Sequence, residues 1–225
     1  MTETMTAMLR LTLYSAATFG RGDGVAGLVD REVEHDRDGF PFLRGRTLKG
    51  LLREAAEEVV FALEQQLDGK NWRGLKDGLF GQPSSNLQRQ GSLHVGDARL
   101  PSMLRRLLSE EIKREKLTPD DVLQALTGIR RQTAMNHYGA PDHATLRSMR
   151  VILRDVSFEA ELSFAVPPAE ESAEDREDKW TLLTAATLNL RAAGTGRNRG
   201  RGWLRATLID EEKTLHYFKR LLPRQ

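Results

Sequence analysis

Glycine and arginine alternate near the end of the chain, in the stretch best suited to binding a charged ligand. Residues 194–202 read GTGRNRGRG, and no acidic residue occurs from Lys179 to Ile209. Glycine permits positive φ angles, exposed backbone N–H groups bind anions, and guanidinium groups offer forked donors to phosphate. Trp203 follows directly and could stack on a base, but its place at the start of a predicted strand favours core packing. A row of arginines suits a strand of phosphates, which predicts nucleic-acid contacts by Arg197, Arg199 and Arg201; the alternative is a flexible surface turn.

A second group of basic residues surrounds the predicted start of a helix. The N-terminus of a helix binds phosphate through its free N–H groups and its dipole. Cations at this end reduce helix stability unless an anion compensates for them, so their presence indicates a phosphate ligand. Thr47 is a plausible N-cap, and Arg53 lies one turn beyond Lys49. The predicted contacts are Arg44, Arg46, Thr47, Lys49 and Arg53; the alternative is a set of solvated helix-end charges.

The predicted loop from Phe19 to Gly45 carries the acids that could support catalysis: Asp23, Asp30, Glu32, Glu34, Asp36 and Asp38. A carboxylate here could help to bind magnesium, which stabilises charge developing at a scissile phosphate, or could orient a 2′-hydroxyl for attack. His35 is a candidate general base, although a single loop histidine is more often solvated. His137 and His143 lack cysteine partners and give weak support for zinc.

Composition and charge narrow the class of protein. The 225-residue chain has no cysteine, which excludes disulfides and thiolate chemistry. It shows no signal-peptide pattern and no apolar run of about 20 residues, so a soluble cytoplasmic protein without membrane contact is expected. Net charge is +2, but eight acids gather between Glu159 and Asp178, flanked by basic segments at 130–154 and 179–209. This segregation predicts a surface that faces a polyanion. Either the acidic run, which has no evident partner within the chain, or the charged insertion 104–117 is expected to meet the basic surface of a neighbouring subunit.

Periodicity predicts the elements that position these residues. Period-two alternation predicts strands, and 3.6-residue spacing predicts helices. The predicted strands are 8–16, 92–100, 151–166 (as one strand or two) and 203–209. The predicted helices are 48–67, 104–129 with a new turn at Pro119, and 179–193 with Gly194 as C-cap; loops are predicted at 19–45 and 167–177. The order indicates an α+β fold, a ferredoxin-like sandwich of two helices on an antiparallel sheet, with residues 101–149 inserted.

Four stretches follow one another in an order typical of a known family. FPFLRGRTLKGLLREAAEE (40–58) opens the first helix, SLHVGDARL (92–100) forms the second strand, and RQTAMNHYGAPDHATLRSMRVI (131–152) contains a Gly-Ala turn. The pattern G-x-G-R-x-R-G-x-G (194–202) precedes the last strand. Together these motifs resemble the RAMP superfamily of CRISPR-associated proteins, and the resemblance covers most of the chain.

The resemblance implies a modified ferredoxin-like or RNA-recognition-motif fold. Residues 1–225 would form a single domain, with a helical thumb or lid at about 101–149. The single-domain members of this layout are backbone subunits of type III effector complexes, which are antiviral ribonucleoproteins. The implied partners are therefore CRISPR RNA, target RNA and other subunits of a multi-subunit assembly. Arg131, which opens the third stretch, joins the predicted RNA contacts.

The resemblance also indicates a catalytic position. Members that cleave target RNA carry an aspartate required for metal-dependent cleavage, within a pattern close to Asp-Ser-Pro-(V/I)-x-(K/R)-Asp. DREVEHD (30–36) keeps both aspartates at that spacing. Asp30 falls on the catalytic position, as a ligand of magnesium or another divalent cation. Arg31 and Glu32 replace Ser-Pro, and one residue is missing before Pro41.

Three functions are consistent with these features. The first is a CRISPR RNA-binding backbone subunit that is also an endonuclease for complementary target RNA. The second is a non-catalytic structural subunit with the same RNA contacts, and Asp30 distinguishes the two. The third is a guide-processing endoribonuclease of the same superfamily. Such enzymes usually have two ferredoxin-like domains and a catalytic histidine near the first helix, whereas this chain has room for one such domain and no histidine within that predicted helix.

Overall fold

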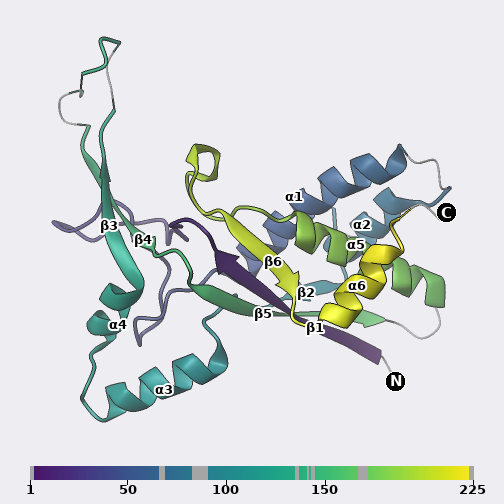
Figure 1. The fold of residues 1–225 in the computed structure, drawn as a ribbon, viewed down its shortest axis with the longest axis horizontal. Helices are drawn as coiled ribbons and strands as arrows, with labels where there is room; N and C mark the ends of the chain where they lie inside the picture. Colours follow the sequence, from purple (N-terminus) through teal and green to yellow (C-terminus); the bar gives the residue numbers. More distant parts are fainter. Residues whose placement is uncertain are drawn as a thin grey trace.

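The computed structural model describes residues 3–65, 69–82, 91–134, 137–140, 142, 145–166 and 172–222. Its main sheet contains β1 (Glu3–Leu13), β2 (Leu93–Val95), β5 (Ser157–Val166) and β6 (Leu204–Leu208). The strands lie in the order β2-β5-β1-β6, and every neighbouring pair is antiparallel (Figure 1). With a helix after β1 and another after β5, this is the ferredoxin-like arrangement. The predicted fold class is confirmed.

Alternation along β1 determines how the sheet meets its helices. Leu9, Leu11 and Leu13 are fully buried, whereas Arg10 and Tyr14 are exposed on the opposite, open face, because successive side chains of a strand face opposite sides. Two predicted helices, α1 (Gly45–Glu64) and α5 (Ala173–Asn189), cover the buried face (Figure 1). Two helices that the pattern did not predict, α2 (Trp72–Phe80) and α6 (Glu211–Lys219), pack beside α5. In the described part of the chain, no helix is long and apolar enough to cross a membrane.

The first helix begins earlier than its apolar periodicity predicts, and its N-cap is Arg44 rather than Thr47. The Gly45 N–H donates to Asp97 Oδ1 at 2.9 Å. A Cβ at Gly45 would lie 2.1 Å from the Val95 carbonyl oxygen. Glycine therefore lets the helix start directly against β2, where the acceptor for a free N–H comes from across the fold rather than from a local cap.

Helix α5, predicted at 179–193, also differs from its prediction at both ends. It begins inside the predicted loop 167–177, because the Ser172 side chain accepts an N–H of the first turn at 3.0 Å and acts as N-cap. Its C-cap is Leu190, so the prediction of Gly194 as the cap is wrong. Residues 167–171 lie outside the described residues.

Between β2 and β5 the chain forms two helices and a separate hairpin. These elements are α3 (Ser102–Lys113), α4 (Pro119–Leu126), β3 (Thr127–Gln132) and β4 (Arg147–Ile152). The β3–β4 hairpin projects away from the main sheet (Figure 1). The predicted helix 104–129 is wrong at its end, because residues from Thr127 onward pair with β4. The predicted strand 151–166 is divided by a turn in which Asp155 takes a φ of 68°.

Described acids of the run 159–178 have partners within the chain, so the expectation that the run has no partner there is wrong. Glu159 Oε1 lies 2.9 Å from Arg10 Nη2 on the neighbouring strand. Asp178 is buried, lies 2.8 Å from Arg220 Nη2 and also contacts Lys70. These ion pairs join elements of the same fold and neutralise the charges of Glu159 and Asp178 locally.

The expectation that Trp203 packs in the core is also wrong. Its side chain is 53% exposed, whereas the next residue, Leu204, is 4% exposed and takes the core position in β6. The reason is register, because Trp203 falls on the open face of the sheet and Leu204 on the helix-covered face.

Candidate functional site: an arginine-lined cavity

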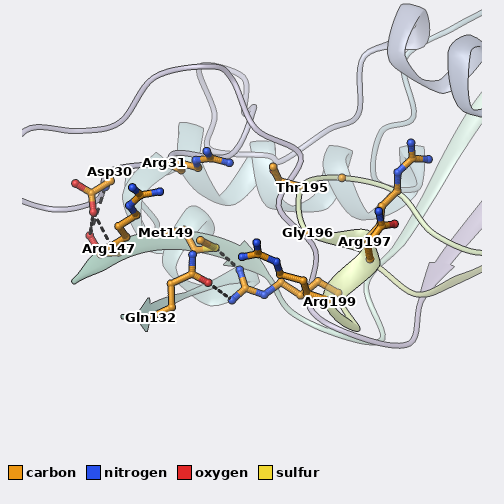
Figure 2. Close-up of a pocket in the computed structure, with 13 residues that line it drawn as sticks. Asp30, Arg31, Gln132, Arg147, Met149, Thr195, Gly196, Arg197 and Arg199 are labelled. Atoms are coloured by element: carbon orange, nitrogen blue, oxygen red, sulfur yellow. Dashed lines mark hydrogen bonds between the residues drawn. The ribbon is translucent and has the colours of Figure 1, made fainter. Parts of the chain in front are cut away.

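A cavity of about 510 Å³ lies between the glycine-rich loop, the β3–β4 hairpin and the segment that contains Asp30 (Figure 2). Among the described residues that line it, Asp30 is the sole acid. The same cavity is lined by five arginines: Arg31, Arg147, Arg197, Arg199 and Arg201. A concave surface with this excess of one charge concentrates the field and attracts anions. Guanidinium groups from several directions suit phosphate in particular.

The glycine-rich loop reaches this cavity through left-handed backbone positions. A short 3-10 helix, Arg197–Arg199, is flanked by Gly196 at a φ of 78° and Gly200 at a φ of 73°. Gly202 has a φ of 66°, and a Cβ there would lie 1.9 Å from the Ala193 carbonyl oxygen. The prediction that these glycines supply positive φ angles is confirmed. They allow sharp turns of the chain on both sides of the short helix, and Arg197, Arg199 and Arg201 all line the cavity.

The three predicted arginines of the loop have different partners. Arg197 forms an ion pair of 2.8 Å with Glu54 of α1. Arg201 donates to Gln132 Oε1 at 2.9 Å and contacts the Met149 sulfur, so it joins the loop to the hairpin (Figure 2). Arg199 is exposed and has no acid partner among the described residues. Arg199 is therefore the loop guanidinium most available to a ligand.

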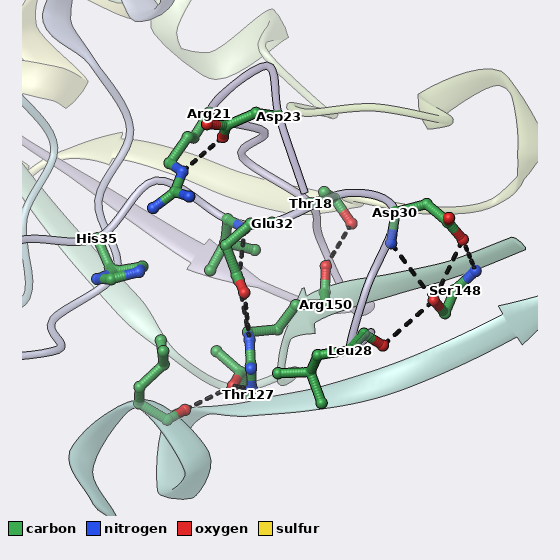
Figure 3. A network of polar contacts seen from close by, with 12 residues as sticks. Thr18, Arg21, Asp23, Leu28, Asp30, Glu32, His35, Thr127, Ser148 and Arg150 are labelled. Carbon is green, nitrogen blue, oxygen red and sulfur yellow. Dashed lines mark hydrogen bonds and ion pairs between the residues drawn. The ribbon is translucent and has the colours of Figure 1, made fainter. Parts of the chain in front are cut away.

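Asp30 is held in place by Ser148 of β4. Its Oδ2 accepts the Ser148 N–H at 2.6 Å and the Ser148 hydroxyl at 3.2 Å, and its own N–H donates to the Ser148 carbonyl at 3.0 Å (Figure 3). The backbone and hydroxyl donors of Ser148, with nearby Arg147, lower the pKa of the Asp30 carboxyl below its ordinary value. The side chain is exposed and ionised at neutral pH, at a fixed place in the cavity.

A buried ion pair between Glu32 and Arg150 joins the segment that contains Asp30 to β4. Arg150 Nε donates to both carboxylate oxygens of Glu32, at 2.8 and 3.1 Å, and Arg150 Nη1 donates to Thr127 Oγ1 at 3.2 Å (Figure 3). The Arg150 N–H also donates to the Arg31 carbonyl at 2.9 Å, so residues 30–32 lie beside β4, with a single parallel bridge between Arg31 and Met149. Arg150 is thus a structural residue and not part of the basic surface that the charge pattern of 130–154 predicts.

A magnesium ion at Asp30 would have to be bound mainly by water and phosphate. Among the described residues, no group of three or more His, Cys, Asp or Glu side chains could hold a metal. Magnesium commonly keeps several waters and takes one or two carboxylates together with substrate phosphates. Oδ1 of Asp30 accepts no hydrogen bond from the described residues, since both Ser148 donors reach Oδ2. One carboxylate oxygen is therefore left for a cation.

The histidines contribute little to this site. His35 is half-buried, its Nδ1 lies 3.0 Å from the Asp36 carbonyl oxygen, and it does not line the cavity. Asp36 accepts the N–H groups of Asp38 and Phe40 and so shapes its own loop. The weak zinc interpretation involves residue 143, which lies outside the described residues.

Only some of the predicted phosphate contacts of the first helix line a cavity. Arg44 and Thr47 line a second cavity of about 510 Å³, which shares Asp30, Arg31 and Arg197 with the first. Arg44 already pairs with Glu34 at 2.8 Å. Arg46, Lys49, Arg53 and Arg131 line neither cavity.

Lys49 lies on a side of the helix that does not line the cavities. Its ammonium group donates to the Leu93 carbonyl of β2 at 2.6 Å, and burial lowers its pKa. Lys49 and Arg53 are one turn apart and share a side of the helix, which is the side toward β2 and α2. Arg31 and Arg147, in contrast, line the main cavity although neither was predicted to contact RNA. Arg31 is next to Asp30 in the sequence and Arg147 lies within the stretch 131–152, and these positions are signals that could have found them.

These features define a class: a ferredoxin-like domain whose glycine-rich loop, placed before the last strand, faces a projecting hairpin across a cationic cavity. The family model of the RAMP superfamily matches residues 11–205, which is most of the chain. The protein belongs to the RAMP superfamily.

Two solved structures have a similar fold. One is a chain from the cryo-EM structure of the type III-B Cmr-beta complex bound to cognate target RNA, at 12% identity, and the other is from the apo state of Cmr-beta, at 11% identity. In both cases the TM-score is 0.61, and the match covers 92% of this chain and 98% of the other. A comparison of the sequence with curated proteins gave no match.

Proposed function

We propose that this protein is an RNA-binding backbone subunit of a type III CRISPR effector complex, and that it cleaves target RNA with the help of Asp30. The observation that carries the proposal is the place of Asp30, an ionised carboxylate that Ser148 fixes at a cavity lined by five arginines. Membership of the RAMP superfamily and the likeness to chains of the Cmr-beta complex support the assignment to such an assembly. Its partners are then CRISPR RNA, target RNA and further subunits.

The cavity suits a phosphate group better than it suits a base. Arg31 and Arg199 have no acid partner among the described residues, so they can neutralise a phosphate without first breaking an ion pair. Contacts of this kind position RNA and carry no sequence information. The subunit therefore binds the guide backbone for any guide sequence.

Asp30 has two possible roles at the scissile phosphate. As a magnesium ligand it would place a cation that stabilises charge developing on the phosphate oxygens. Alternatively its free Oδ1 would orient the 2′-hydroxyl for in-line attack. In both roles the hydrogen bonds from Ser148 keep the carboxylate at one position and ionised.

A non-catalytic structural subunit is the second candidate, and one observation favours it. Asp30 joins its loop to β4 through Ser148, which gives an aspartate a structural reason to stand there without catalysis. A guide-processing endoribonuclease is the third candidate. It is disfavoured because the described residues form a single ferredoxin-like sheet and no histidine lines either cavity.

The test is Asp30→Asn in the assembled complex, with a complementary RNA, with and without a chelator. Asparagine keeps an oxygen that accepts the Ser148 N–H, so the loop should stay in place while the charge is lost. We expect magnesium-dependent cleavage to disappear and guide and target binding to persist. Asp23→Asn is the matched control, because Asp23 is an exposed acid of the same loop that lines the second cavity but not the first.

The outcomes separate the candidates. Equal cleavage by wild type and Asp30→Asn would exclude the assigned site. RNA binding with no cleavage by either form would favour the structural subunit. Cleavage of the guide precursor by the isolated chain would favour the processing enzyme.

A further inference from the structure

An aromatic pair stands at the end of the open face of the sheet, next to the glycine-rich loop. Trp203 directly precedes β6 and Tyr14 directly follows β1, and they are 53% and 55% exposed. The Tyr14 N–H donates to the Trp203 carbonyl at 2.7 Å, and the next pair in the register is Leu13 with Leu204. The two aromatic residues are therefore cross-strand neighbours on the same face of the sheet.

The two rings have no aromatic partner within the described part of the chain. The ring pairs there involve other residues, such as Trp180 with Tyr217. Trp72 and Trp180 are each 4% exposed, so the chain buries its two other tryptophans. Large aromatic side chains are the most favourable groups to bury and are enriched at binding surfaces. Trp203 and Tyr14 therefore leave about half of their side-chain surface accessible to a ligand.

The charge around this pair favours a polyanion. Arg205 is the next residue of β6 on the same face, is exposed, and has no acid partner among the described residues. Trp203 also lies two residues beyond Arg201, which lines the arginine-lined cavity. Among the acids of β5, Glu159 is paired with Arg10. That pair lies four residues from Tyr14, or about 13 Å along the strand.

We propose that Tyr14 and Trp203 form a stacking site for the bases of single-stranded RNA whose phosphates bind in the neighbouring cavity. The inference rests on the RNA binding proposed above and adds contact with bases to the contact with the backbone. Aromatic side chains beside a cationic groove are the usual means of holding single-stranded RNA without sequence preference, because every base has a π face. The site would hold bases of the bound strand flat against the rings while leaving their identity unread.

The test uses the full-length protein and two probes of equal length, a short oligouridylate and its abasic ribose-phosphate counterpart. Trp203 is the exposed member of the three tryptophans, so its fluorescence reports selectively on this site. We expect oligouridylate to quench that fluorescence and the abasic strand to leave it unchanged. By filter binding, Trp203→Ala should bind oligouridylate about tenfold more weakly and should bind the abasic strand as wild type does.

Two further variants separate stacking from other effects. Trp203→Phe keeps an aromatic ring and should restore most of the affinity for oligouridylate. Met8→Ala removes another exposed apolar side chain of the same sheet face, far from the loop, and should bind both strands as wild type does.

Three outcomes would overturn the inference. If wild type and Trp203→Ala both bind the two strands equally, the stacking site is excluded, while the proposed backbone contacts remain. Failure of wild type to bind either strand would overturn it together with the proposed function. Loss of self-association in Trp203→Ala, measured by mass photometry with unchanged RNA affinity, would assign the aromatic pair to a protein partner instead.

Discussion

Replacing Glu32 with alanine should destabilise this protein far more than removing an exposed ion pair. The Glu32 and Arg150 side chains are 1% and 7% exposed. Alanine would remove both acceptors of Arg150 Nε and the acceptor of the Val33 N–H, which donates to Glu32 Oε1 at 2.8 Å. A buried guanidinium would then keep one described acceptor, Thr127 Oγ1.

The magnitude follows from burial. Removing one partner of a buried pair costs about 3–5 kcal/mol, because the other charge stays desolvated and uncompensated. For a chain of this size that loss corresponds to a fall in Tm of about 6–20 °C. Glu32 is also two residues from Asp30, so the segment beside β4 should loosen and RNA cleavage should fall as well.

Urea denaturation followed by circular dichroism measures the effect directly. Arg10→Ala is the matched control, since the Arg10–Glu159 pair is 48% and 19% exposed. Loss of an exposed pair costs less than about 1 kcal/mol. A double variant, Glu32→Met with Arg150→Met, should recover most of the stability, because a well-packed apolar pair often replaces a buried ion pair without loss.

Two results would refute the reasoning. The first is a loss of stability in Glu32→Ala no larger than that in Arg10→Ala. The second is a double variant as unstable as Glu32→Ala, which would mean that lost packing rather than an uncompensated charge is the cause.

The remaining predictions concern the cavity. The pKa of Asp30 is lowered in the folded protein, so its carboxylate should stabilise the fold above the ordinary pKa of about 3.9, and this stabilisation should be lost as the pH falls through the folded pKa. Ser148→Ala removes one hydrogen-bond donor and should raise the pKa of Asp30 in an NMR titration; an unchanged pKa would contradict the assignment. Arg199→Ala should reduce the slope of log K against log salt for single-stranded RNA by about 0.7, and a filter-binding series with the wild-type slope would argue against a phosphate contact. Gly202→Ala should lower Tm more than Gly200→Ala. Both positions need a positive φ, which costs alanine about 1–2 kcal/mol, and only at Gly202 would the added Cβ also lie 1.9 Å from a carbonyl oxygen. Equal losses of Tm would show that the loop adjusts freely.

Local patterns in the sequence determined the main frame of the fold. The alternation of apolar residues in β1 and the 3.6-residue spacing of α1 depend on neighbours within one element, so they can be read along the chain. The order of these elements along the chain allows few antiparallel sheets, and the structure has the ferredoxin-like one. The glycine-rich loop was also readable, since the positive φ angles at Gly196, Gly200 and Gly202 depend on the lack of a Cβ.

Tertiary structure alone decided how the charged residues are used. Asp30 bonds to Ser148 and Glu32 pairs with Arg150, in each case 118 residues away in the sequence, so neither contact leaves a local pattern. Arg150 is buried in this pair.

Strand register decided the place of Trp203. A shift of one residue exchanges the two faces of a strand, and composition cannot reveal which face Trp203 takes. Charge and ring type can be read from a sequence, but whether a side chain is buried, paired or free to bind depends on which distant segment packs against it.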